Sequence, residues 1–379
     1  MLKLKEQKEV AVKVLSFVTK LSSTEFAIYN GEEETNYELL THSPEELNVR
    51  LTPYEQGEYR FNVMMDIIEK REIPIADIDI VITQAEVDAL PGGIYLVNDE
   101  LSALMCESRI DENAQRSALF VAGRLADYVN SMDMCECLPL VLAPSVNDEI
   151  ISDAALSGMK GFARFPVFHA LSHRAAAAVA ADDMKKTPNS VNLVVAHLGT
   201  EISVGAYDRG RIIDCNSPLD GEGPFSPTTA GALPTEALLN LCYAGKYDMD
   251  EMMNRIQFSG GLAAYLGNGK MQSVKEAHSR GDKKTIFLVK AMAYKVAREI
   301  GSKVAALNGK VDRIVITGPW ALFESFVKEI IQRVEWIAPT FVYVWRSELY
   351  LLMTSAARTF EGTVKLGLYS EDEIYRSAD

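Results

Sequence analysis

The sequence predicts an α/β protein of two domains, and three observations carry that prediction. Its 379 residues exceed what one ordinary hydrophobic core organises. Short apolar runs of strand length alternate along the chain with longer stretches of helical spacing. A meander of three short strands opens each half, at about residues 9–40 and again at residues 191–214.

The first half begins with strands predicted at residues 9–17, 25–29 and 33–40, and Asn30-Gly31 supplies a hairpin turn. Ser43 and Pro44 indicate a helix start, as the N-cap and the first helical residue. Apolar runs and helical spacing then predict strands at 78–83 and 139–142 and helices at 62–70, 114–128 and 170–181.

In the second half, an apolar run at 193–196 and alternation through 202–206 predict two strands of a hairpin. The turn at Asp208-Arg209-Gly210 leads into a third strand at 211–214. Further elements are predicted as strands at 314–316 and 341–344 and helices at 235–242, 248–256, 282–307, 321–334 and 349–359. The linker Lys185–Ser190 predicts domains 1–187 and 188–348, with residues 349–379 packing back on the first.

Composition limits the classes of partner. A net charge of −15 opposes non-specific binding to nucleic acid or to anionic membranes. No stretch has the ~18 uninterrupted apolar residues of a membrane span, and the charged first residues lack a signal-peptide core. We therefore expect a cytoplasmic protein. Its five cysteines have no metal-ligand spacing, which favours buried free thiols and no metal site.

Several motifs together identify a family resemblance. They are Pro91–Asn98 (PGGIYLVN), His197–Gly199, Leu219–Pro227 (LDGEGPFSP), Gly231–Pro234 and Val311–Gly318. The chain closely resembles the butyrate kinase branch of the acetokinase family. The resemblance implies two ribonuclease H-like, actin-like ATPase domains around a central cleft, and a homodimer formed through the second domain. It also implies ATP and Mg²⁺ as cofactors and a reaction that converts a short carboxylate to an acyl phosphate.

The same resemblance places the nucleotide. It implies cofactor-binding positions at Ser22, Ser23 and Thr24 in the turn after the first strand, and at Gly199, Thr200 and Gly318 in the second half. This chain departs from the family there, because Lys20 replaces a glycine and Glu25 replaces a lysine. Pro319 also replaces a glycine, and we expect Trp320 to fill the adenine pocket, the alternative being that it stacks on a base.

The catalytic positions depart further. His197 and Glu348 are the remnants that match the family. The family's arginine, histidine, aspartate and second arginine are replaced at Thr83, Asn113, Ala143 and Thr229, respectively. A threonine hydroxyl cannot supply the charged fork of a guanidinium, and one such arginine is worth roughly 10³–10⁵ in phosphoryl-transfer rate. The sequence therefore predicts a degenerate member with weak or no kinase activity, which acts by binding or assembly.

Alternatives remain open at this point. An active short-chain carboxylate kinase would need cations relocated to Lys20, Arg116 or Arg346. Glu201 replaces a hairpin glycine; it either ligates Mg²⁺ or points to solvent because no nucleotide binds, and the second reading is favoured. A different reaction in the same cleft is a third alternative, although no motif specifies one.

Overall fold

The computed structural model describes residues 11–20, 23–43, 52–85, 93–103, 113–143, 149–164, 166–344, 347–362 and 364–369. It divides into two compact units, Met1–Ser145 with Glu348–Asp379, and Val146–Ser347. This division falls earlier than the predicted boundary at residue 187. Helix α5 (Ala170–Asp183), which the prediction assigned to the first domain, packs against β7 and β10 of the second unit.

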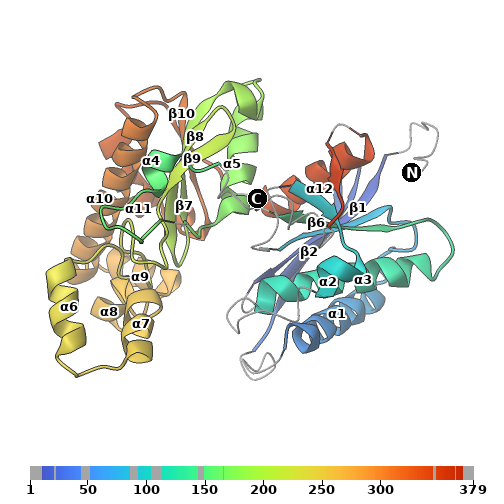
Figure 1. Cartoon of the computed structure of the whole chain (residues 1–379), viewed down its shortest axis with the longest axis horizontal. Coiled ribbons are helices and arrows are strands. Elements are labelled where there is room, and N and C mark those ends of the chain that lie inside the picture. The colour runs from blue at the N-terminus through green and yellow to red at the C-terminus, as the bar shows by residue number, and fades with distance from the viewer. Residues whose placement is uncertain are drawn as a thin grey trace. The chain divides into compact units, whose positions relative to one another are not determined.

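The first unit is a seven-stranded mixed sheet in the order β12-β5-β6-β4-β1-β2-β3. Helices α1 and α3 pack on one face, and α12 lies over the other (Figure 1). Its elements are β1 (Lys13–Lys20), β2 (Ser23–Asn30), β3 (Glu33–Thr41), α1 (Pro53–Lys70), β4 (Ile80–Gln84), β5 (Gly93–Leu96), α2 (Asp99–Ala103), α3 (Asn113–Asn130), β6 (Leu138–Ala143), α12 (Ser347–Phe360) and β12 (Leu366–Gly367).

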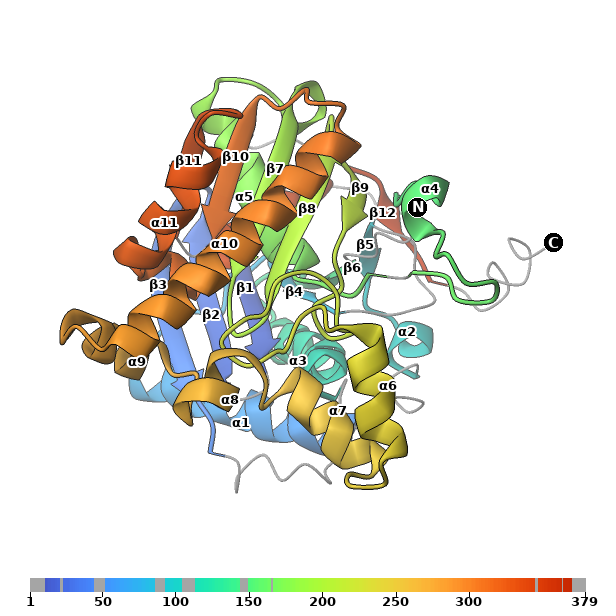
Figure 2. The same ribbon diagram turned by 90° about the vertical axis from the view of Figure 1, so that its left-hand side faces the viewer.

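The second unit is a five-stranded sheet in the order β11-β10-β7-β8-β9. Figures 1 and 2 show α10 and α11 on one face of this sheet and α5 on the other. Its remaining elements are β7 (Asn192–Leu198), β8 (Ile202–Asp208), β9 (Arg211–Cys215), α6 (Thr235–Tyr243), α7 (Met249–Gln257), α8 (Gly261–Leu266), α9 (Met271–Ser279), α10 (Lys283–Ala306), β10 (Arg313–Thr317), α11 (Glu324–Val334) and β11 (Thr340–Val342), with short 3₁₀ turns at Pro188–Ser190 and Pro319–Leu322.

Strand β1 shows where period-two alternation misleads. The sequence predicts a strand at residues 9–17, but β1 begins at Lys13 and runs to Lys20. It lies between an antiparallel neighbour, β2, and a parallel one, β4, and its residues from Val14 to Thr19 are buried. A central strand covered on both faces needs a continuous apolar run, so alternation does not mark its ends.

Four of the five cysteines lie in the part of the chain that the structure describes. Cys137 and Cys215 are buried as predicted, Cys135 is partly buried, and Cys242 is exposed on α6; Cys106 lies outside the described residues. The prediction of buried thiols is thus wrong for Cys242. Across the part of the chain that the structure describes, no group of His, Cys, Asp or Glu is arranged to hold a metal, and no helix is long and apolar enough to cross a membrane.

A buried arginine shapes the turn between β1 and β2. Arg60 of α1 is fully buried, and its guanidinium donates to the carbonyls of Lys20 (2.8 Å) and Ser23 (2.9 Å) and to the Thr24 hydroxyl (2.8 Å). Burial lowers the pKa of Arg60 to about 10, so it remains charged at neutral pH. The guanidinium therefore fixes both ends of this turn from inside the domain.

Arg60→Met is expected to destabilise the first unit by about 3 kcal/mol, because it leaves two carbonyls and a buried hydroxyl without their donor. Denaturant unfolding measures the effect. The matched control is Arg124→Met, since Arg124 is exposed and lies over the Phe61 ring. A loss no larger than the control's would contradict a structural role for Arg60.

Candidate functional site

The turn between β7 and β8 is the centre of the predicted nucleotide site in the second unit. Gly199, Thr200 and Glu201 form it, and the Gly199 amide donates to the Glu201 carbonyl at 3.0 Å. A Cβ atom at Gly199 would lie 2.9 Å from His197 Nε2. The glycine is therefore required by the packing of the turn on His197, whether or not a phosphate approaches it.

Glu201 turns back toward its own domain. Its carboxylate lies 3.4 Å from His169 Nε2, and only about a quarter of its side chain is exposed. Hydrogen bonding to His169 lowers the pKa of Glu201. The favoured prediction that Glu201 points to solvent is therefore wrong, because a histidine from the start of α5 captures it.

Two histidine rings stack beside this pair. The rings of His169 and His197 lie 3.9 Å apart at 14°, and His197 is largely buried. His169 Nδ1 is 3.0 Å from Ser203 Oγ, which is itself 2.9 Å from His173 Nε2. Glu201, His169, Ser203 and His173 thus form one chain of polar contacts under the hairpin.

The loop after β9 closes over the hairpin tip. The Thr200 carbonyl accepts hydrogen bonds from the Ser226 hydroxyl and from the Thr228 hydroxyl, the latter at 3.0 Å. Thr229, where the sequence predicts that an arginine of the family is replaced, is fully buried, and its hydroxyl donates to Ser226 Oγ at 2.8 Å. The Thr229 side chain therefore points into the domain and presents no group to a ligand.

Helix α8 fixes that loop from below. The amides of Gly260, Leu262 and Ala263 donate to the carbonyls of the loop residues Thr228, Ser226 and Pro227, respectively, at 2.8–3.0 Å. A Cβ atom at Gly261 would lie 1.8 Å from the Ser226 carbonyl oxygen. Glycines retained here serve close backbone packing.

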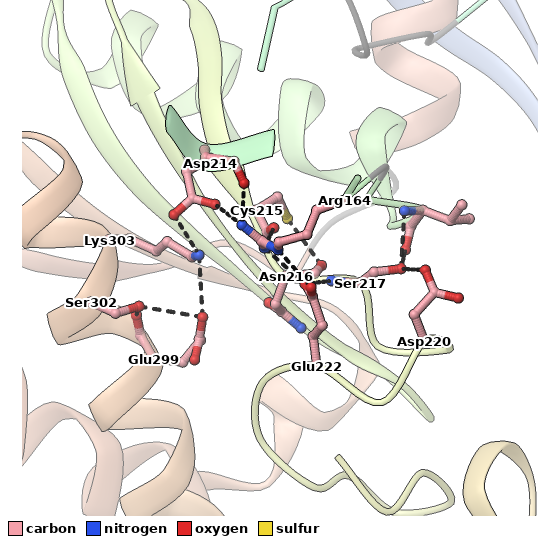
Figure 3. A network of polar contacts seen from close by, with 12 residues as sticks. Arg164, Asp214, Cys215, Asn216, Ser217, Asp220, Glu222, Glu299, Ser302 and Lys303 are labelled. Atoms are coloured by element: carbon pink, nitrogen blue, oxygen red, sulfur yellow. Dashed lines mark hydrogen bonds and ion pairs between the residues drawn. The ribbon is translucent and has the colours of Figure 1, made fainter. Parts of the chain in front are cut away.

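A network of charged residues anchors the start of the same loop (Figure 3). Arg164 donates to both carboxylate oxygens of Glu222, from Nε at 2.6 Å and from Nη2 at 2.8 Å, and Nη2 also reaches the Cys215 carbonyl at 3.0 Å. Lys303 of α10, almost fully buried, donates to Asp214 at 2.9 Å and pairs with Glu299 at 3.2 Å. These contacts join residues 149–164, β9 and α10.

In the first unit, the predicted site residues Thr83, Thr24 and Ala143 are also buried within their own unit. Thr83 is fully buried in β4 and donates to the Phe17 carbonyl at 2.9 Å. Thr24 is buried between Arg60 and His42, 2.9 Å from the latter's Nε2. Ala143 is buried at the end of β6, and Asn113 begins α3. Ser22, Arg346 and the side chains of Asn113 and Arg116 lie outside the described residues.

Lys20 is the relocated cation that the structure does describe. Its ammonium lies 3.0 Å from Glu25 and 3.5 Å from Glu348. Burial opposes the charge, but the two carboxylates prevail and raise the pKa of Lys20. The two residues at these predicted replacements, Lys20 and Glu25, thus form an ion pair with each other, and Glu348 joins them.

Gly318 and Trp320 follow β10. Gly318 has a φ of 89°, and a Cβ atom there would lie 2.6 Å from the Leu198 carbonyl oxygen, so glycine is required for β7 and β10 to end side by side. Trp320 is only 3% exposed and packs edge-on against Phe326 and near Phe323. An indole in that core cannot stack on a base, as the alternative for Trp320 required.

Sequence reasoning gave no role to His169, His173, Arg60 or Arg164. His169 and His173 lie in and beside Phe168–Ser172, a stretch that the family resemblance covers, but nothing in their spacing links them to residue 201. Arg60 sits on an amphipathic helix, where an arginine is usually solvated. Contacts between residues far apart in sequence assign these four side chains.

Comparison with known proteins identifies the family and the fold of this chain. Each unit contains a meander of three antiparallel strands, β1–β2–β3 in the first and β7–β8–β9 in the second, and the fold is the actin-like ATPase fold. The profile of the Acetokinase family matches residues 156–336. A probable butyrate kinase of Clostridium botulinum is 33% identical over 349 residues, which is 92% of this chain and 97% of that protein. Butyrate kinase 2 of Clostridium acetobutylicum is 33% identical over 351 residues, covering 92% of this chain and 97% of its own length.

The chain therefore belongs to the acetokinase family, in its butyrate kinase branch. Among solved structures, Porphyromonas gingivalis acetate kinase aligns with a TM-score of 0.72 at 14% identity, covering 92% of this chain and 99% of that one. A Francisella tularensis propionate kinase gives a TM-score of 0.70 at 16% identity, covering 90% and 98%. These likenesses confirm the predicted fold.

His173 predicts an acid sensitivity. Burial, and secondarily the neighbouring His169, lower the pKa of His173 to about 3 from an ordinary 6.5. Below pH 6.5 the His173 side chain is protonated in the unfolded chain but stays neutral in the folded chain. The free energy of unfolding therefore decreases as the pH is lowered. We expect a loss of about 2 kcal/mol between pH 6.5 and 4.5 from this group. Denaturant unfolding of His173→Gln should show a pH dependence that is flatter by that amount, and an unchanged pH dependence would contradict the prediction.

Glu222→Gln tests the network of Figure 3. Arg164 loses its charged partner, and we expect the second unit to lose about 2 kcal/mol of stability. The matched control is Glu335→Gln on the exposed end of α11, with a change within about 0.5 kcal/mol. Thermal or denaturant unfolding of both variants measures the difference. If Glu222→Gln is as stable as Glu335→Gln, the network does not stabilise the second unit.

Proposed function

We propose that this acetokinase-family protein has weak or no carboxylate kinase activity and acts in the cytoplasm through binding or assembly. The observation that supports the proposal best is how the replaced positions are used. Thr83 and Thr229 are buried and hydrogen-bonded inside their own units. Lys20 is held there in an ion pair, and Glu201 in a polar contact with His169. A side chain whose polar atoms are bonded within its own unit in this way is not directed toward a substrate.

The family reaction needs positive charge at the positions that the buried threonines occupy. An acyl-phosphate-forming kinase must hold the spread charge of a transferring phosphoryl group with cations and amides. Neutral, buried threonines at both arginine positions cannot do so. Loss of one such arginine costs roughly 10³–10⁵ in rate, and here two are replaced.

ATP and Mg²⁺ are the cofactors that membership of this family suggests. The described residues of the hairpin fit them poorly, because the carboxylate of Glu201 stands at the turn and is already paired with His169. At ~4 Å, a phosphate charge and a carboxylate repel by about 4 kcal/mol at an effective dielectric constant of 20. A bound Mg²⁺ could turn this repulsion between carboxylate and phosphate into an attraction only if Glu201 left His169.

The competing function is an active short-chain carboxylate kinase with relocated cations. Lys20 does not favour it, since Glu25 and Glu348 already neutralise its charge. The butyrate kinase names of the relatives are the argument on its side. The two functions differ in product formation, so one assay separates them.

The test combines an acyl-hydroxamate assay, using butyrate, ATP and Mg²⁺, with thermal unfolding in millimolar Mg-ATP. We expect turnover far below the ordinary enzyme range of ~1–10³ s⁻¹. Ligand at ~100 times its dissociation constant would stabilise the protein by ~2.7 kcal/mol and raise the melting temperature by several degrees. A shift without product would indicate a nucleotide-binding protein, and turnover within the ordinary range would overturn the proposal.

A further inference from the structure

Strand β11 ends the sheet of the second unit, and its outer side has no neighbouring strand among the residues that the structure describes. On the inner side it pairs in parallel with β10, and just beyond it the Tyr343 amide donates to the Ile316 carbonyl. Because hydrogen bonds alternate along a strand, the backbone groups of Thr340 and Val342 point away from β10. Figure 2 shows β11 at the margin of the sheet, with α11 beside it. The strand therefore offers backbone donors and acceptors to another chain.

Two other sheet edges of the protein are protected. At the opposite edge of the same sheet, the Ile212 amide of β9 donates to Glu149 at 2.9 Å, and the Ile213 carbonyl accepts from Ile151. Strand β3, an edge of the first sheet, has the sequence EETNYELLT, with three glutamates. Covering segments and charges of this kind prevent pairing with other chains. Residues 340–344 (TFVYV) contain no charge and no proline, so β11 lacks such protection.

A groove beside this edge can receive side chains. It has a volume of about 540 Å³, and its apolar lining comes from Ala321, from Val327 and Ile331 of α11, and from Val342 of β11. Val342 is 38% exposed. Side chains at matching positions of neighbouring strands point to the same face of a sheet. A strand added to β11 would therefore place every second side chain in this groove.

The charged lining of the groove comes mainly from the two ends of α11. Glu324 begins the helix and Glu335 follows its last residue, so roughly 16 Å of helix separates them. Neither carboxylate has an ion-pair partner in the described part of the chain, and Lys328 is the cation between them. Residues four to six apart on an extended chain span about 13–20 Å. Two basic residues at that spacing would match both carboxylates.

We propose that the β11 edge and its groove dock an extended segment of a partner protein, with apolar residues at alternate positions and a basic residue on either side of them. The added strand pairs with the outward backbone groups of Thr340 and Val342, and its apolar side chains fill the groove. Its basic residues reach Glu324 and Glu335. A nucleic acid or an anionic membrane matches neither the backbone groups nor the carboxylates. This surface goes beyond the proposed function and is independent of kinase activity.

A synthetic peptide tests the proposal on the full chain. The probe is the blocked, fluorescently labelled heptapeptide KTVTVTK, which directs its two valines and both lysines to one face when it is extended. We expect saturable binding by fluorescence anisotropy, weakened at least about 10-fold when glutamates replace the lysines. The same peptide with every backbone amide N-methylated should not bind, because it cannot donate hydrogen bonds to the edge.

Variants of the protein locate the binding surface. Val342→Lys places a charge on the edge and in the groove, and we expect it to weaken binding of the peptide about 30-fold. The matched control is Met253→Lys, which should bind as the wild type does. Met253 is also 38% exposed and lies on α7, far from β11 in Figure 2. Combining Glu324→Gln with Glu335→Gln should weaken binding about 10-fold and reduce its dependence on salt.

Far-UV circular dichroism shows whether each variant is folded, which is expected because Val342 and both glutamates are exposed. A wild-type chain that does not bind the probe would overturn the proposal, and so would equal binding by Val342→Lys or equal binding of the N-methylated peptide. If the wild-type chain self-associates and Val342→Lys abolishes that association, the edge serves a second copy and the proposal fails as well. None of these outcomes depends on acyl phosphate formation, which tests the proposed function separately.

Discussion

The bidentate ion pair between Arg164 and Glu222 is the constraint on which the second unit's site depends. It holds the beginning of the loop after β9 against the segment that leads into α5, with Asp214 and Lys303 closing the network from β9 and α10. With that end fixed, residues 226–229 reach the Thr200 carbonyl and the start of α8. The loop position, and with it the inward direction of Thr229, follows from this anchor.

The replaced residues form new partnerships. In the first unit, Lys20 and Glu25, which the sequence predicts to replace a glycine and a lysine of the family, form an ion pair across one hairpin. In the second unit, Glu201 pairs with His169 across another. Simple loss of function would leave such charges unpartnered in solvent, where substitution is nearly free. Partly buried, mutually satisfied pairs indicate that these turns contribute to the stability of their own domains.

The glycines retained in the second unit are explained by packing. Gly199, Gly261 and Gly318 stay because backbone or ring atoms lie within 3 Å of where a Cβ atom would stand. Thr83 and Thr229, where the resemblance places arginines of the family, are buried and hydrogen-bonded within their own units.

The sequence by itself determined the family, the two α/β units and most strands and helices, because apolar periodicity and glycine turns are local signals. It also led to the prediction that Thr83 and Thr229 replace arginines of the family. Only the tertiary structure decided where those side chains point. The partner of Glu201 is His169, 32 positions earlier in the sequence, and the buried Arg60 reaches the turn after Lys20 from another helix. Such pairings depend on how distant segments pack, and no local pattern encodes them.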